Sequence, residues 1–229
     1  MRCLLMGGQA CVFYGAAQFS RDLDLAIAPH QANVERLRAA MDELDARHVE
    51  VPELGLPVLA RGHAVHFRCQ REDVRGLRID VMSAMRGLPS FEQLWDRRTV
   101  IEFDGVPVDM LSLPDLVAAK KTQRLKDWPM IQRLVERSYL AAKQPSEAEI
   151  RFWLAELRTP ELLLEVAERF PEEAAGCERG AAKAALNGDL AEVEAALAAE
   201  EAAEREVDRI HWAPLKKEIE AFRRDRSRG

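Results

Sequence analysis

Residues 7–25, GGQACVFYGAAQFSRDLDL, hold the pattern that decides the fold. A glycine pair opens this stretch directly after an apolar run, which indicates a buried strand that ends in a tight turn and is followed by a short helix. Further on, DLDLAI alternates polar and apolar side chains with the period of a half-buried strand. Asp22 and Asp24 therefore project from the same face of that strand.

The two aspartates indicate a metal site. Carboxylates held this close repel each other, and Mg²⁺ removes that repulsion because it binds carboxylate oxygens, phosphates and water. An isolated Asp-x-Asp is otherwise a common acidic edge strand. Here Gly7 and Gly8 leave backbone N–H groups open to a phosphate chain at a helix start, and Ser20 lies on the same side of the chain as Asp22. We predict that Gly7, Gly8 and Ser20 bind phosphates beside the metal-binding pair.

A third carboxylate is expected from the strand LRIDVMS, residues 77–83, in which Asp80 faces away from its apolar neighbours. If this strand lies beside the DLDLAI strand, Asp80 completes the three-carboxylate cluster of a two-metal phosphoryl-transfer site and assists deprotonation of the acceptor hydroxyl. Asp73, in a turn, and Asp109, beside a helix start, are the competing candidates. The predicted catalytic and metal-binding residues are Asp22, Asp24 and Asp80.

The pattern of predicted elements changes near residue 143. Before it, the sequence predicts helices over 31–48, 90–96, 112–124 and 127–143, further strands over 64–70, 77–83, 99–103 and 106–111, and a loop over 51–62. After it, strand signals vanish and alanine, glutamate and leucine dominate. We therefore predict an α+β fold: a small mixed β-sheet core flanked by helices over residues 1–143, then an all-helical C-terminal domain over 144–229.

The composition and charge of the chain are those of a globular protein without a membrane span. The 229 residues are 48% hydrophobic and 31% charged, as in a globular protein, and the net charge of −6 argues against a chain that coats nucleic acid non-specifically. The sequence has no run of about 18 apolar residues, so no membrane span is predicted. Its four scattered cysteines lack a CxxC pair and indicate reduced thiols. We expect a cytoplasmic protein with no membrane partner.

The order strand, Gly-Gly, helix, Ser-x-Asp-x-Asp and separate strand aspartate resembles the nucleotidyltransferase fold of the DNA polymerase β-like superfamily. Residues 108–134, VDMLSLPDLVAAKKTQRLKDWPMIQRL, narrow the resemblance to bacterial nucleotidyltransferases related to abortive-infection type IV toxins and to relatives in toxin–antitoxin pairs. In those proteins a helix that carries a lysine is followed by a basic residue and by a Lys-Asp pair that opens the next helix. The matching positions are Lys120, Arg124, Lys126 and Asp127.

The resemblance covers about residues 1–143. It implies a Mg²⁺-dependent enzyme that transfers a nucleoside monophosphate from an NTP to an acceptor hydroxyl, and it adds the four positions above to the nucleotide-binding residues. Lys120 and Arg124 are four residues apart, which predicts that they share one helix face and neutralise a triphosphate there; a solvated face is the alternative. Asp127 is either a helix N-cap or a site residue that contacts Lys120.

The acceptor stays open. In the resembled family it can be the 3′ end of a tRNA, but a protein side chain or an aminoglycoside suits the same core, and an antitoxin protein is the partner expected of a toxin. Four arginines form a basic stripe in the sequence: Arg68, Arg71, Arg75 and Arg78. The stripe would suit the phosphates of an RNA, or it is simply an exposed hairpin. The histidines, His66 included, show no metal or triad spacing. A catalytically inactive nucleotide- or RNA-binding module is the alternative function, although the retained carboxylates argue against it.

Overall fold

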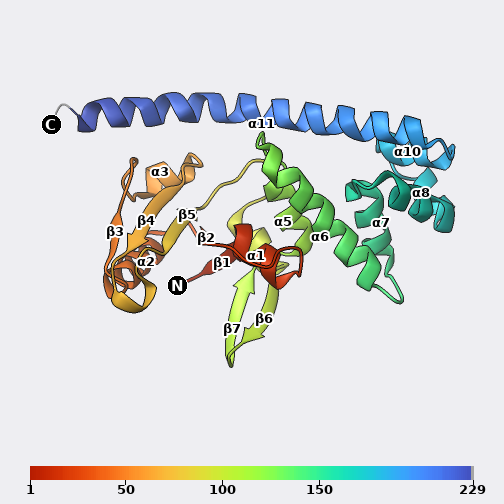
Figure 1. Ribbon diagram of the computed structural model, residues 1–229. Helices are drawn as coiled ribbons and strands as arrows, with labels where there is room; N and C mark the ends of the chain where they lie inside the picture. Colours follow the sequence, from red (N-terminus) through yellow and green to blue (C-terminus); the bar gives the residue numbers. More distant parts are fainter. Residues whose placement is uncertain (228–229) are drawn as a thin grey trace. The chain divides into compact units, whose positions relative to one another are not determined.

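The computed structural model describes residues 1–227 (Figure 1). The chain forms two compact units. Unit 1 comprises Met1–Ala119 together with the described residues from Ile210 on, and unit 2 is Lys120–Arg209. The predicted boundary at residues 143–144 lies inside unit 2.

Unit 1 is built on one mixed seven-stranded sheet in the order β3-β4-β5-β2-β1-β7-β6. The pairs β1–β7 and β2–β5 are parallel, and the other neighbouring pairs are antiparallel. The α+β class and the mixed sheet are therefore confirmed. The strands are β1 (Cys3–Met6), β2 (Asp22–Ile27), β3 (Ala46–His48), β4 (Val65–Cys69), β5 (Arg78–Met82), β6 (Thr99–Phe103) and β7 (Val106–Met110).

The helices of unit 1 differ from the predicted ones at several places, among them the bounds of the first helix and a 3-10 helix at Glu72–Val74, in the predicted turn. The helix predicted over 31–48 ends at Glu43, because Asp45 adopts a left-handed backbone with φ 45° and the chain then forms β3. The predicted loop over 51–62 contains a short helix, and the helix predicted to run to residue 124 ends at Lys120. The helical elements are α1 (Gly7–Phe13), α2 (Gln31–Glu43), α3 (Leu56–Ala60), η1 (Glu72–Val74), α4 (Phe91–Asp96) and α5 (Leu113–Lys120).

Unit 2 is helical throughout, which confirms the predicted helical C-terminal region. Proline in the first turn opens α6, α8 and α9, and Ser146 caps α7 with a capping box to Glu149. Among residues 1–227 no helix combines the length and the apolar character that a membrane crossing requires. The elements are η2 (Leu125–Asp127), α6 (Trp128–Ala141), α7 (Glu147–Glu156), α8 (Pro160–Arg169), α9 (Pro171–Ala175), α10 (Gly180–Leu186) and α11 (Leu190–Arg226), whose last part belongs to unit 1.

The register of the sheet fixes where polar side chains can lie. One row of paired residues crosses five strands and is apolar and buried; it comprises Val65, Val81, Leu25, Leu5 and Met110. Successive residues of a strand point to opposite faces, so the neighbouring row lies on the other face. That second row contains His66, Asp80, Asp24 and Met6 in register. The alternation therefore puts a core on one face of the central strands and the predicted site on the other.

Candidate active site

The pairing of β2 with β5 brings the three predicted carboxylates onto one face. In this parallel pair Asp24 is the register partner of Asp80, and Asp22 is the register partner of Arg78. Asp22 and Asp24 are two residues apart on one strand, so both point to the face that Asp80 also occupies. Asp80 is largely shielded, with a side chain 19% exposed. The central strands therefore hold a cluster of three acidic residues.

The two competing aspartates lie elsewhere. Asp73 is in the η1 turn, where its carboxylate accepts a 2.7 Å hydrogen bond from Arg71 Nε. Asp109 is on β7, which is separated from β2 by β1, and it accepts a 2.5 Å hydrogen bond from Arg98 Nε. Of the three candidates, Asp80 is therefore the one that lies directly beside Asp24.

The Gly-Gly turn makes room for the side chains of the site. Gly7 has φ +66°, and a Cβ there would lie 1.8 Å from Asp24 Oδ2. A Cβ on Gly8 would lie 2.3 Å from Ser20 Oγ, and the Gly8 amide donates a 3.4 Å hydrogen bond to Asp24 Oδ2. The Ser20 segment is held by Gln9, whose Nε2 donates to the Ser20 carbonyl at 2.9 Å. The glycines thus let the backbone approach both the carboxylate and the hydroxyl.

Asp80 has two polar neighbours that the sequence pattern did not assign to the site. His66 Nδ1 and Arg78 Nε each lie 2.8 Å from Asp80 Oδ1, and Oδ2 takes part in neither contact. Burial raises the pKa of Asp80, but the hydrogen bonds from His66 and Arg78 outweigh it, so the pKa lies below the ordinary value of 3.8. A carboxylate whose pKa is lowered is a weaker proton acceptor than an ordinary one. Its surroundings favour a charged, ligand-type role over the predicted role in deprotonation.

The donor set of the cluster suits Mg²⁺. Within residues 1–227 no three His, Cys, Asp or Glu side chains are arranged to hold a metal ion by themselves. Mg²⁺, however, is commonly held by one or two carboxylates together with substrate phosphates and water. Asp22 and Asp24 provide that pair of carboxylates, beside the Gly7–Gly8 turn. The residues present therefore fit a metal that binds together with a nucleotide.

Replacing Arg78 by methionine is expected to raise the pKa of Asp80, because a hydrogen bond and a positive charge are lost. A depressed carboxyl pKa stabilises the fold above its unfolded value of about 3.8, and this contribution is lost as the pH falls through the lower, folded pKa. Arg78→Met should therefore lose less stability on acidification than wild type. Carboxylate NMR titration of the metal-free protein measures the pKa directly. Arg75→Met, at an exposed arginine of the turn that precedes β5, is the control; an equal pKa of Asp80 in both variants would contradict the assignment.

Side chains from the end of α5 and from the segment after it contact one buried carboxylate, that of Asp127. Asp127 is 4% exposed, and it accepts hydrogen bonds from Thr122 Oγ1 at 2.6 Å and from Arg124 Nε at 2.8 Å. Lys120 Nζ lies 3.8 Å from the other carboxylate oxygen. Of the two roles predicted for Asp127, contact with Lys120 is observed. Asp127 also occupies the N-cap position of α6, although within residues 120–141 its side chain makes no capping bond.

The predicted shared helix face of Lys120 and Arg124 is wrong. The chain turns directly after α5, with the Thr122 amide donating to the Lys120 carbonyl at 2.8 Å, and Trp128 Nε1 donates to the Thr122 carbonyl at 2.9 Å. Lys126 is exposed on η2. These residues belong to unit 2 and the three aspartates to unit 1. The phosphate-binding role of Lys120, Arg124, Lys126 and Asp127 stays a prediction.

The basic stripe predicted from the sequence is divided in the structure. Arg68 and Arg78 are register partners on β4 and β5, whereas Arg71 pairs with Asp73 in the turn between these strands. Arg47, which the sequence pattern placed in a helix, is on β3 and is the register partner of Arg68. The alternation of His66 and Arg68 with apolar residues was the signal that could have put both side chains on the face of the site.

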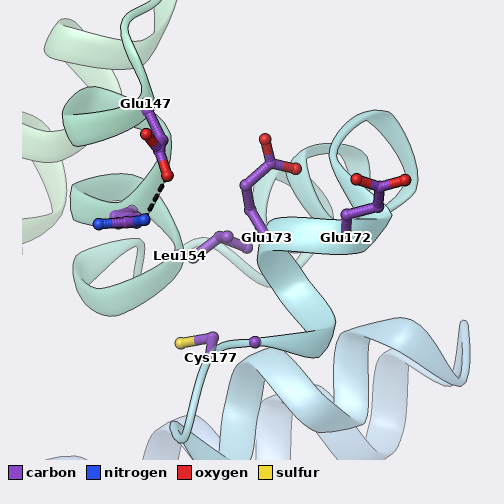
Figure 2. Close-up of a pocket in the computed structure, with 7 residues that line it drawn as sticks. Glu147, Leu154, Glu172, Glu173 and Cys177 are labelled. Carbon is purple, nitrogen blue, oxygen red and sulfur yellow. Dashed lines mark hydrogen bonds and ion pairs between the residues drawn. The ribbon is translucent and has the colours of Figure 1, made fainter.

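Figure 2 shows a cavity of unit 2 with a volume of about 540 Å³. It is lined from α7 by Glu147 and Leu154, and from α9 by Glu172 and Glu173. Glu147 is paired with Arg151 of the same helix. None of the predicted site residues lines this cavity, and we assign it no ligand.

Comparison with known proteins gives one structural likeness. No protein-family model matches the chain, and no curated protein matches it. Among solved structures, the chain is similar to the crystal structure of an antigenic nucleotidyltransferase-like protein from Paracoccidioides brasiliensis. The identity is 14%, the match covers 76% of this chain and 83% of that chain, and the TM-score is 0.43. A likeness at this level carries no argument about chemistry, which depends on the geometry of the site.

Proposed function

We propose that this protein is a Mg²⁺-dependent nucleotidyltransferase, which moves a nucleoside monophosphate from an NTP to an acceptor hydroxyl. The observation that carries the proposal is the register of β2 with β5, in which Asp24 lies beside Asp80 and Asp22 lies two residues along the same face. The Gly7–Gly8 turn adjoins Asp24 of this cluster. Carboxylates for a metal beside a glycine turn, where no side chain blocks the approach of phosphates, suit phosphoryl transfer.

Each residue of the site has a role in this reaction. The acceptor oxygen bonds to the α-phosphorus, the bond from that phosphorus to the pyrophosphate oxygen breaks, and the acceptor proton passes to solvent. Asp22 and Asp24 would hold Mg²⁺, which would supply positive charge to the triphosphate and to the leaving group. Asp80 adds negative charge beside them, and Gly7, Gly8 and Ser20 bind phosphate oxygens. Positioning and charge neutralisation supply most of the catalysis.

The finer assignment follows the resemblance of the sequence. We place the enzyme with the toxin-related bacterial nucleotidyltransferases, acting in the cytoplasm, with an antitoxin protein as partner. Lys120, Arg124, Lys126 and Asp127 then contribute to nucleotide binding. A neighbouring gene for a small antitoxin-like protein would support this placement, and expression of the chain with and without that gene would test toxicity.

Titration calorimetry tests nucleotide binding. Wild type is expected to bind MgATP or MgCTP, and Asp22→Ala/Asp24→Ala is expected to lose that binding. The matched control, Glu72→Ala/Asp73→Ala, removes two exposed carboxylates from the η1 turn and should bind as wild type does. The enzyme assignment would be wrong if wild type bound no nucleotide, or if all three proteins bound nucleotide equally well.

A nucleotide-binding module without catalysis is the second candidate. The observation in its favour is that Asp80 Oδ1, part of a carboxylate that a two-metal site needs, already accepts a hydrogen bond from Arg78 and lies 2.8 Å from His66 Nδ1. This module would bind NTP but release no pyrophosphate over any acceptor pool. Pyrophosphate release that depends on Mg²⁺ and on Asp24 would exclude it.

A further inference from the structure

The face of the sheet that carries the three aspartates also carries a line of arginines. Register pairs Arg47 of β3 with Arg68 of β4, Arg68 with Arg78 of β5, and Arg78 with Asp22 of β2. Residues in register share a face, so these side chains form one row across the sheet that ends at the carboxylates. This arginine row consists of Arg47, Arg68 and Arg78.

The arginine row includes one arginine, Arg68, whose side chain has no acidic partner within residues 1–227. Like charges directly opposite on paired strands are destabilising, and the row repeats that arrangement twice. The Arg47 side chain is 75% exposed, with Asp45 3.9 Å away. Arg68 is exposed, and its side chain forms no hydrogen bond or ion pair within residues 1–227. Arg78 has a close carboxylate partner, Asp80. The whole chain carries a net charge of −6, so three arginines in register do not follow from its composition.

The position of the row relative to the carboxylates matches the geometry of the reaction. In the sheet order β3-β4-β5-β2-β1, the row spans β3, β4 and β5, and the Gly7–Gly8 turn follows β1 on the other side of the aspartates. In phosphoryl transfer the attacking and leaving oxygens lie roughly in line. If the proposed function holds and pyrophosphate leaves on the glycine side, the acceptor approaches from the side of the row.

We propose that the arginine row binds the phosphates of a nucleic-acid acceptor and directs its hydroxyl toward the three aspartates. Neighbouring strands are about 4.8 Å apart, so the row presents cations at regular intervals, as a nucleic-acid strand presents phosphates. The guanidinium fork suits phosphate oxygens. A cationic aminoglycoside would be repelled by the same row. This inference rests on the proposed function and selects among the acceptors that the sequence left open.

The test is a binding titration that needs neither Mg²⁺ nor NTP. Fluorescence anisotropy of a short labelled single-stranded RNA is followed at several salt concentrations for wild type and Arg47→Gln/Arg68→Gln. Both arginines are exposed, so the variant is expected to fold. The affinity should fall about tenfold or more at low salt, and the salt slope should decrease by about 1.4, at about 0.7 for each lost contact with a single strand. Arg71→Gln/Arg75→Gln removes the same charge from the adjacent turn and should leave both quantities unchanged.

Three outcomes would overturn the proposal: RNA binding unaffected by the row variant, an equal loss in the turn variant, or displacement of RNA by polyglutamate at an equal concentration of charges. The last would indicate an acidic protein as the ligand. Calorimetry of wild type with MgATP separates the two proposals. Wild type that binds RNA through the row but binds no nucleotide would leave the row's role in binding intact and remove the transferase assignment.

Discussion

Replacing Asp24 by asparagine is expected to lower nucleotide transfer about a thousandfold, a loss of about 4 kcal/mol of transition-state stabilisation. Asparagine keeps the shape of the side chain and an oxygen that can accept the hydrogen bond from the Gly8 amide. It removes the negative charge that holds Mg²⁺, and Asp24 is the register partner of Asp80 at the centre of the cluster. Incorporation of labelled NTP into an RNA pool, with pyrophosphate release measured in parallel, gives the rate.

Asp24→Asn should lose activity without losing stability. The three carboxylates repel one another in the metal-free protein, so removing one charge should leave the free energy of unfolding unchanged or increase it. Asp73→Asn, an exposed carboxylate of the η1 turn, is the matched control for the rate and should retain full transfer. A thousandfold loss accompanied by unfolding would make Asp24 a structural residue. Full activity in Asp24→Asn would rule out this cluster as the active site.

The local sequence pattern was enough to predict which strand face each aspartate of the cluster occupies. Alternation along DLDLAI and LRIDVMS determines the face that Asp22, Asp24 and Asp80 occupy, because a strand has a period of two. Whether the two strands lie side by side is a different property, since fifty residues (28–77) separate β2 from β5 and their pairing depends on the order of the whole sheet. From the sequence, the three aspartates could be predicted to form one cluster only if their two strands were neighbours. The register of β2 with β5 shows that they are.

The arginine row shows why the remainder could not be predicted. The apolar spacing of α2 continues to Leu44, so the pattern extended the helix through Arg47. The three residues of β3 are too few to show alternation, and they become a strand through pairing with β4. The same reason applies to the segment after α5, where helical spacing predicted one face for Lys120 and Arg124. Long-range hydrogen bonds hold the turn there, because the Gln123 amide donates to Asp208 and the Gln123 carbonyl accepts from Arg205. The side chains of Lys120 and Arg124 still contact Asp127.

Replacing Gly7 by alanine is expected to reduce the free energy of unfolding by roughly 2–5 kcal/mol. Two costs add. The left-handed backbone at φ +66° costs an L-residue about 1–2 kcal/mol, and forcing extra volume into a packed site costs about 1–3 kcal/mol. The second cost is specific to the site, because the new Cβ would lie 1.8 Å from Asp24 Oδ2 and 2.6 Å from Asp24 Cβ. Denaturant titration monitored by circular dichroism gives the loss.

Gly87→Ala separates the two costs. Gly87 has φ +73°, and a Cβ there would meet nothing within 4 Å, so this variant should show only the backbone cost of about 1–2 kcal/mol. A double-mutant cycle then isolates the overlap: in an Asp24→Gly background, which removes every side-chain atom at that position, Gly7→Ala should cost no more than Gly87→Ala does. If Gly7→Ala costs the same with and without the Asp24 side chain, the glycine turn does not make room for the carboxylate, and the link between the Gly-Gly pair and the Asp-x-Asp strand is lost.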